Sequence, residues 1–211
     1  DERGRRYVRE TLDYDEDTIR DIVVVAFEEA RKRRGLLHSV HKSNVLRSSV
    51  LWNEVVEETR SDYPDVDLRH VIVDAAATAL VLKPGQFDVM VMENMFGDIL
   101  SDLGGGLLGS LGLMPSACIG REKAYYEPSH GSAPDIAGQG IANPYSMIGS
   151  VALMLEKSFD MAGEARAVWG AMRSVFDRGF VTADLATGAP DEKVLGTSAF
   201  GDEVAAALET G

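Results

Sequence analysis

The stretch FDVMVMENMFGDILSD, residues 87–102, decides the fold that this sequence predicts. Its first part, from Phe87 to Met92, is an apolar run apart from Asp88, and such runs are typical of a strand buried on both faces of a sheet. Asp98 and Asp102 follow four residues apart, so a helix would place both carboxylates on one face. A buried strand that leads into such a helix is one repeating unit of an α/β fold.

The chain before this stretch alternates helical and β-like patterns. Apolar residues at helical spacing predict helices, and short β-prone runs predict strands. The predicted helices span 15–34, 48–63 and 75–82, and the predicted strands span 36–40 and 68–73. This alternation favours an α/β fold with a buried sheet.

The chain after this stretch begins with a glycine-rich region at 104–112, where backbones can approach closely. A long loop rich in Gly, Pro, Ser and Ala then runs from Glu127 to Pro144. Helical periodicity returns at three places, namely 144–157, 164–178 and 201–209.

Composition excludes several classes of protein. A formal net charge of −13 disfavours binding to nucleic acid or to an anionic membrane, which both need clustered cations. No apolar run approaches the roughly 18 residues that span a bilayer. The single cysteine, Cys118, excludes an internal disulfide and fits a reducing, cytoplasmic setting. Its small apolar neighbours predict a buried, inert thiol.

Four residues stand out as candidates for chemistry. Asp98 and Asp102 on one helix face would repel each other without a cation, and carboxylate oxygens suit Mg²⁺ or Mn²⁺. Two solvent-facing acids on an exposed helix are the alternative. Lys42, in a strand-to-helix loop, is a candidate base or a surface ion-pair partner. Asp74 follows a predicted strand, where open α/β sheets place ligand groups.

The loop from Glu127 to Pro144 is a candidate nucleotide site. Loops of this composition present backbone amides to phosphates and allow a ligand to approach closely. No GxGxxG follows a strand, so a standard Rossmann cofactor site is not indicated.

Three blocks of the sequence resemble those of the β-decarboxylating dehydrogenases, the isocitrate/isopropylmalate dehydrogenase family. They are Val40–Leu46 (VHKSNVL), Glu93–Asp102 (ENMFGDILSD) and the loop Glu127–Pro144, and they occur in the same order. The resemblance covers essentially the whole chain. It implies an isopropylmalate dehydrogenase-like two-domain α/β fold whose N-terminal portion is missing from this chain. Residues 1–113 would form a central dimer-forming domain, and residues 114–211 would return to the larger NAD-binding domain.

The resemblance also implies a reaction, the oxidative decarboxylation of a 2-hydroxy-3-carboxy acid with NAD. The substrate it favours is 3-isopropylmalate, in leucine biosynthesis, as Gly109–Ala117 (GSLGLMPSA) suggests. Isocitrate, homoisocitrate and tartrate remain open, as does a non-catalytic subunit or fragment. His41 replaces the Asp common in isopropylmalate enzymes, and Ala75 stands where Asn often follows the metal-binding Asp. Both departures make the assignment of the substrate less specific, and they leave the implied reaction chemistry unchanged.

The resemblance carries roles over residue by residue. Asp98 and Asp102 would hold Mg²⁺ or Mn²⁺ together with Asp74 from the second subunit of a homodimer with shared active sites. Lys42 of that neighbour would take the hydroxyl proton of a small hydroxy-dicarboxylate substrate. Asp135 would accept hydrogen bonds from the ribose hydroxyl of NAD and repel the 2′-phosphate of NADP. The residues implied to bind the cofactor are Asn44, Glu127, His130, Gly131, Ser132, Ala133, Pro134, Asp135, Ile136, Asn143 and Asp184.

Overall fold

The structure, a computed structural model, describes residues 4–210, so residues 1–3 and 211 lie outside the description. Its contacts divide the chain into two units, Asp1–Ser101 and Asp102–Gly211. The division falls within the helix α4 (Asn94–Leu108), and each unit is described by itself. The assignment of residues 1–113 to a dimer-forming domain stays a prediction. Among residues 4–210, no helix has the length and apolarity that crossing a membrane requires.

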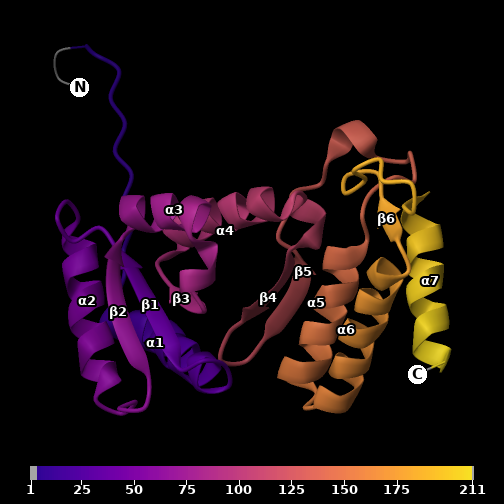
Figure 1. Cartoon of the computed structure of the whole chain (residues 1–211). Coiled ribbons are helices and arrows are strands. Elements are labelled where there is room, and N and C mark those ends of the chain that lie inside the picture. The colour runs from indigo at the N-terminus through magenta and orange to yellow at the C-terminus, as the bar shows by residue number, and fades with distance from the viewer. Residues whose placement is uncertain (1–3, 211) are drawn as a thin grey trace. The chain divides into compact units, whose positions relative to one another are not determined.

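The first unit is built on a three-stranded parallel sheet in the order β2-β1-β3 (Figure 1). Its central strand β1 is buried along nearly its whole length, and β2 and β3 lie on either side of it. Helices α1 and α2 pack against each other and against β1, and α3 follows β2 directly. These elements are β1 (Leu36–His41), β2 (Asp67–Ile72), β3 (Val89–Val91), α1 (Glu16–Arg31), α2 (Arg47–Arg60), α3 (Val73–Leu82) and the 3-10 turn Pro84–Gln86.

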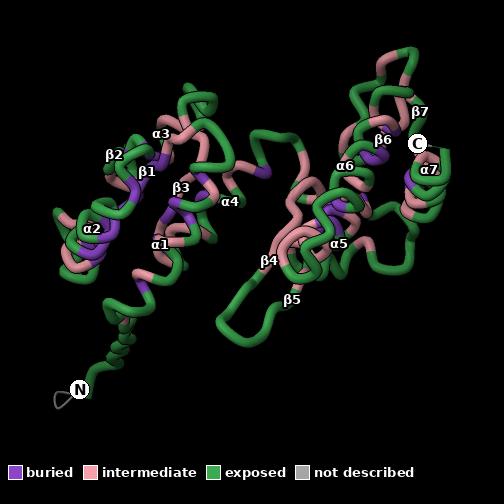
Figure 2. Tube along the Cα trace, turned by 90° about the horizontal axis from the view of Figure 1, so that it is seen from below, coloured by how far each residue is buried: buried purple, intermediate pink, exposed green. Residues whose placement is uncertain are grey.

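One hydrophobic cluster joins these helices to the sheet. The rings of Phe27 from α1 and Tyr63 after α2 stack with centroids 4.7 Å apart. Figure 2 shows the buried positions gathered where α1, α2 and β1 face one another. The buried members are Ile19, Val23, Ala26, Phe27, Ala30, Leu37, Trp52, Val55, Val56, Tyr63, Val66, Leu68 and Val91.

The predicted burial of the strand within 87–102 was wrong in part. The strand β3 is shorter than the apolar run, and of its three residues only Val91 is buried. The reason is its place in the sheet, because among residues 4–210 β3 pairs with β1 alone and lies at the edge of these three strands. An apolar run alone does not distinguish an edge strand from a central one.

The second unit contains a hairpin, a short parallel pair and three helices. The hairpin strands β4 (Pro115–Ile119) and β5 (Ala124–Pro128) are antiparallel, and α5 (Tyr145–Ser158) packs on both. Helix α6 (Ala162–Asp177) packs between α5 and α7 (Thr197–Thr210), as Figure 1 shows. The remaining elements are the parallel pair β6 (Phe180–Thr182) and β7 (Lys193–Leu195) and the 3-10 turns Leu111–Leu113 and Pro134–Ile136.

A buried serine on α5 attaches this helix to the hairpin. The Ser150 hydroxyl accepts a hydrogen bond from the Ser116 amide at 3.1 Å and donates to the Glu127 carbonyl at 2.9 Å. The hairpin itself was not predicted from the sequence. The prediction of a buried Cys118 was also wrong, because this residue pairs with Tyr125 near the hairpin turn and is exposed.

Candidate functional site

Lys42 and Asp74 form an ion pair at the carboxyl ends of two neighbouring strands. Lys42 follows β1 directly, and Asp74 lies in the first turn of α3, which begins where β2 ends. Because β1 and β2 are parallel, their carboxyl ends meet at one edge of the sheet. Lys42 Nζ lies 2.6 Å from Asp74 Oδ1. This hydrogen bond holds the pKa of the Asp74 carboxyl below its usual value.

The backbone around Lys42 is held by hydrogen bonds on both sides of its peptide unit. The Lys42 amide donates to the hydroxyl of Ser49, a buried residue in the first turn of α2, at 3.0 Å. Its carbonyl accepts from the amides of Val45 and Leu46, each at 2.9 Å. Lys42 thus projects from a tight turn, with one quarter of its side chain exposed. Asn44 lies in the same turn and is exposed.

The histidine beside Lys42 belongs to the sheet. The His41 side chain is buried, and its Nδ1 accepts a hydrogen bond from the Ser43 amide at 3.2 Å. Its ring contacts that of His70 on β2, which in turn bonds to Glu57 at 2.9 Å. Burial, together with the nearby His70, lowers the pKa of His41.

Helix α4 carries the predicted metal-binding acids. Asp98 and Asp102 lie one turn apart on this helix, and both residues are exposed. Neither carboxylate forms an ion pair within residues 4–210. Over the same residues, no three His, Cys, Asp or Glu side chains are grouped to hold a metal ion. The described part of one chain therefore does not bring Asp74, Asp98 and Asp102 together.

A cavity of about 460 Å³ lies in the second unit, beside the loop that the sequence singled out. Six predicted cofactor residues line it: His130, Gly131, Ala133, Ile136, Asn143 and Asp184. Six further residues were not predicted to line it: Ser110, Leu111, Gly112, Ile141, Ala142 and Ala183. Ser110 and Gly112 belong to the glycine-rich region 104–112, which was the sequence signal that could have found them. Glu127, Ser132, Pro134 and Asp135 lie outside the lining.

Asp184 is a hydrogen-bond acceptor in the lining of this cavity. It follows β6 and accepts hydrogen bonds from the Ser110 hydroxyl and, at 3.2 Å, from Asn143 Nδ2. Burial alone would raise the pKa of Asp184, but these hydrogen bonds outweigh burial and lower it. The carboxylate is thus held at the cavity by hydrogen bonds from two other segments of the second unit.

Two contacts hold the loop beside this cavity, and one of its residues has a left-handed backbone conformation. His130 Nε2 lies 3.1 Å from the hydroxyl of Ser146, which is fully buried in the first turn of α5. Gly112 packs so closely on Asn143 that an added Cβ would lie 2.8 Å from the Asn143 Cβ. Ala133 adopts a φ of 43°, a left-handed conformation that costs energy for a residue other than glycine.

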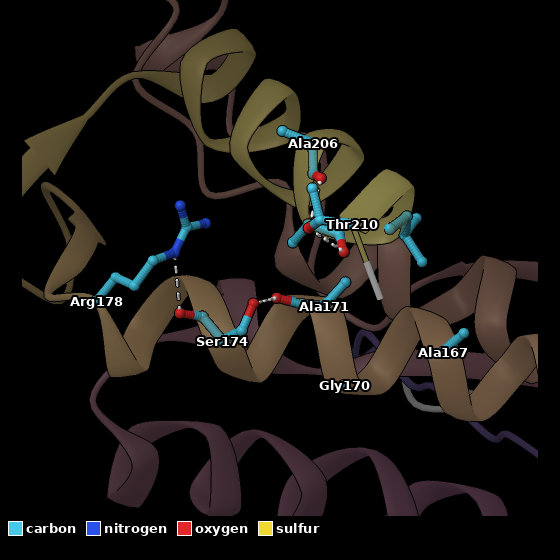
Figure 3. Close-up of a pocket in the computed structure, with 9 residues that line it drawn as sticks. Ala167, Gly170, Ala171, Ser174, Arg178, Ala206 and Thr210 are labelled. Atoms are coloured by element: carbon cyan, nitrogen blue, oxygen red, sulfur yellow. Dashed lines mark hydrogen bonds between the residues drawn. The ribbon is translucent and has the colours of Figure 1, made fainter.

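A larger cavity, of about 640 Å³, lies between α6 and α7 (Figure 3). Small residues such as Ala167, Gly170 and Ala206 line it, and the one charged side chain in its lining is Arg178. The Arg178 guanidinium is bound to Glu203 at 2.8 Å. This cavity contains none of the predicted site residues, and its lining offers no group for acid–base or metal chemistry.

Comparison with known proteins shows the family of this chain. A family described as isocitrate/isopropylmalate dehydrogenase matches residues 1–204. A 3-isopropylmalate dehydrogenase of Xanthomonas campestris pv. campestris is 52% identical over 97% of this chain, and one of Thermotoga maritima is 52% identical over 95%. The matches cover 57% and 56% of those two relatives, so this chain spans a little over half of their length.

Solved structures show the same likeness. The isocitrate dehydrogenase of Methylococcus capsulatus superposes with a TM-score of 0.85 and 41% identity, over 92% of this chain and 57% of that one. A β-decarboxylating dehydrogenase from Thermococcus kodakarensis gives a TM-score of 0.78 and 34% identity, over 93% and 56%. The predicted α/β fold of this type, in partial form, is confirmed. The chain belongs to the isocitrate/isopropylmalate dehydrogenase family.

Proposed function

We propose that this chain forms part of an NAD- and metal-dependent dehydrogenase that oxidises and decarboxylates a 2-hydroxy-3-carboxy acid. The first candidate substrate is 3-isopropylmalate, the substrate that gives several relatives their name. The observation that carries the proposal is the Lys42–Asp74 pair at 2.6 Å, because it joins two predicted active-site residues at one sheet edge.

The residues that would hold a metal fit a hard divalent cation. Asp98 and Asp102 supply carboxylate oxygens on exposed positions of α4, free of competing ion pairs within residues 4–210. The third ligand, Asp74, would come from a second copy of the chain, in a homodimer with shared active sites. Bound Mg²⁺ or Mn²⁺ would polarise the substrate hydroxyl and stabilise the negative charge that develops as carbon dioxide leaves.

Lys42 would take the proton of the substrate hydroxyl as the hydride leaves for NAD. Its ammonium now donates to Asp74, so the two residues would enter the neighbouring subunit's site together. For Lys42 to act as a base, the Asp74 carboxylate must turn away from Nζ and the nitrogen must lose its proton. The tight turn held by Ser49 keeps the lysine backbone in place while that exchange occurs.

The cavity beside α5 fits the adenosine half of a dinucleotide. Its volume of about 460 Å³ lies within the range of roughly 300–1,000 Å³ that small-molecule sites occupy. Asp184 would accept from a ligand amino group, and Asn143 and His130 would lie against the ribose. Asp135 is exposed on its 3-10 turn, where its charge would disfavour the 2′-phosphate of NADP.

Isocitrate is a second candidate substrate, with homoisocitrate and tartrate behind it. The structure titled isocitrate dehydrogenase from Methylococcus capsulatus is 41% identical to this chain. His41 also matches the His-Lys pattern of isocitrate relatives, whereas the GSLGLMPSA run favours 3-isopropylmalate. A non-catalytic subunit is the alternative from another class, and the presence of Lys42, Asp74, Asp98 and Asp102 speaks against it.

The test is NADH formation by the purified protein with Mn²⁺ on four substrates: 3-isopropylmalate, isocitrate, homoisocitrate and tartrate. We expect turnover to be highest with 3-isopropylmalate and to fall at least 100-fold in Lys42→Met, as general acid–base catalysis contributes about 10²–10⁴. Arg47→Met, an exposed cation close to the same turn, is the control. Full activity in Lys42→Met would contradict the proposal, and so would a lack of turnover on all four substrates after the amino-terminal half is added.

A further inference from the structure

Glu93 lies immediately before α4 and binds the first turn of this helix with its side chain. Its Oε2 accepts a hydrogen bond from the Met95 amide at 3.0 Å, and its Oε1 accepts one from the Phe96 amide at 2.9 Å. Its carbonyl accepts the Gly97 amide at 2.9 Å. The first amides of a helix have no partner within the helix, and a negative charge there is favourable. Glu93 therefore supplies both the hydrogen-bond acceptors and the charge that this helix end needs.

Tyr14 holds the Glu93 carboxylate from the other side. Its hydroxyl donates to Oε2 at 2.8 Å across 79 residues of sequence. The Tyr14 ring packs against the hydrophobic cluster of the first unit, so the donor is attached to the core. Burial, and then the bond to Glu93, raise the pKa of Tyr14, so its hydroxyl keeps its proton at neutral pH.

The same contact reaches the turn that carries Lys42. A small cavity is bounded by Tyr14 and Glu93 together with Ser49 and Trp52. Ser49 is the residue whose hydroxyl accepts a hydrogen bond from the Lys42 amide. One packed group of side chains thus stands behind the start of α4 and behind the Lys42 turn.

We infer that Tyr14 and Glu93 are positioning residues that fix the first turn of α4 and, through it, the carboxylate of Asp98 for a divalent cation. The inference rests on the proposed function, because only that proposal makes Asp98 a metal ligand. Neither residue is expected to touch metal or substrate. Their effect would be transmitted by the helix, in which Asp98 lies five residues after Glu93.

Three substitutions separate this role from a general loss of stability. Tyr14→Phe removes only the hydroxyl and keeps the ring in the core. Glu93→Ala removes both acceptors, whereas Glu93→Gln keeps a carbonyl oxygen that can accept from Tyr14 or from one helix amide. Tyr63→Phe is the matched control, because Tyr63 belongs to the same cluster but stacks on Phe27.

Two measurements are made on the full chain with each variant. The first is amide hydrogen exchange of Met95 and Phe96, which reports the helix start without any ligand. The second is Mn²⁺ binding, measured by the electron paramagnetic resonance signal of free Mn²⁺. We expect roughly fivefold faster exchange at both amides in Glu93→Ala, the factor by which loss of a helix cap typically shifts helix stability, and measurably weaker Mn²⁺ binding. Tyr14→Phe should show a smaller effect, Glu93→Gln a partial recovery, and Tyr63→Phe no change in either.

The outcomes distinguish the inference from the proposed function. Unchanged exchange and unchanged Mn²⁺ affinity in Glu93→Ala, while Asp98→Asn abolishes binding, would overturn the positioning role and leave the metal site intact. Equal changes in Tyr63→Phe would overturn it too, since the effect would then be general destabilisation. If the unsubstituted chain binds no Mn²⁺, the metal part of the proposed function fails. Faster exchange in Glu93→Ala would then still support the anchoring of α4, but the link to Asp98 would be lost.

Discussion

Asp184 is the residue whose contacts make the clearest prediction for ligand binding. It lies on the cavity wall and binds Ser110 and Asn143, so its charge is both positioned and stabilised. Asp184→Asn removes that charge and replaces one acceptor oxygen with an amide nitrogen, which cannot accept a hydrogen bond. We expect NADH binding, followed by nucleotide fluorescence, to weaken about tenfold or more, since bonds to charged groups contribute about 1.5–3 kcal/mol.

Asp191→Asn is the control for that substitution. Asp191 lies in the same β6–β7 connection and is exposed, but it does not line the cavity. Its loss should leave NADH binding within about twofold of the original. If the two substitutions weakened NADH binding equally, the cause would be a change in the loop as a whole. Asp184 would then not be a binding residue.

The pKa of His38 leads to a prediction of how the stability of the protein depends on pH. This residue is buried in β1, and its Nδ1 has no hydrogen-bond partner among residues 4–210. Burial, and then the charge of Arg69, lower its pKa below the ordinary value of 6.5. The unfolded chain therefore binds a proton at a higher pH than the folded chain does. Stability is full above about pH 6.5 and is lost as the pH falls from there through the lowered folded pKa.

The substitution His38→Leu tests this dependence. Because the buried nitrogen is unpartnered, an apolar side chain of similar size should be neutral or stabilising by about 1 kcal/mol at pH 7. Urea unfolding between pH 5 and 8 should show a shallower loss of stability on the acid side. Some dependence should remain, since the pKa of His41 is also lowered. An unchanged pH profile in His38→Leu would contradict the assignment.

At the level of elements, replacing glycine by alanine at two helical positions should change stability in opposite directions. An added Cβ on Gly149 of α5 would lie 2.9 Å from the Trp169 ring and 3.0 Å from Pro115. Gly149→Ala should therefore destabilise by about 1–3 kcal/mol, as overpacking typically does. Gly170 of α6 has nothing within 4 Å of its added Cβ, and Gly170→Ala should stabilise by about 0.5–1 kcal/mol. Urea midpoints measure both, and a shift of the same sign in the two variants would contradict the packing described for α5.

The elements also show what the sequence could predict and why. The helices α1, α2 and α5 begin and end within a few residues of the predicted bounds, because each has apolar residues at helical spacing. The hairpin β4–β5 was missed, since its strands are short and largely exposed and depend on α5 for their packing. Edge or central position, as for β3, is decided by partners that a local pattern does not contain.

The site was predictable to the extent that its residues follow from local motifs. Asp74 and Lys42 lie where the predicted strands end, and the structure pairs them. Asp98 and Asp102 share α4 as their spacing predicted. Ser110 and Tyr14 were not identified as site residues, because their contacts with Asp184 and Glu93 join segments 74 and 79 residues apart. No local spacing encodes such a contact.

At the level of the whole molecule, the account requires more than the described part of one chain. Asp74 pairs with Lys42, whereas Asp98 and Asp102 lie on α4, and residues 4–210 contain no three-residue group suited to a metal. The proposed homodimer with shared active sites would reconcile these positions with the proposed chemistry. The central claim is therefore that the acid pair of α4 binds a divalent cation.

Calorimetric titration with Mn²⁺ tests this claim most directly, because another acid pair in the chain serves as a control. Asp17 and Asp21 are also exposed and four residues apart, on α1. We predict saturable Mn²⁺ binding that is abolished in the double variant Asp98→Asn, Asp102→Asn and unchanged in the double variant Asp17→Asn, Asp21→Asn. Absence of binding by the unsubstituted chain, or an equal loss in both double variants, would contradict the account.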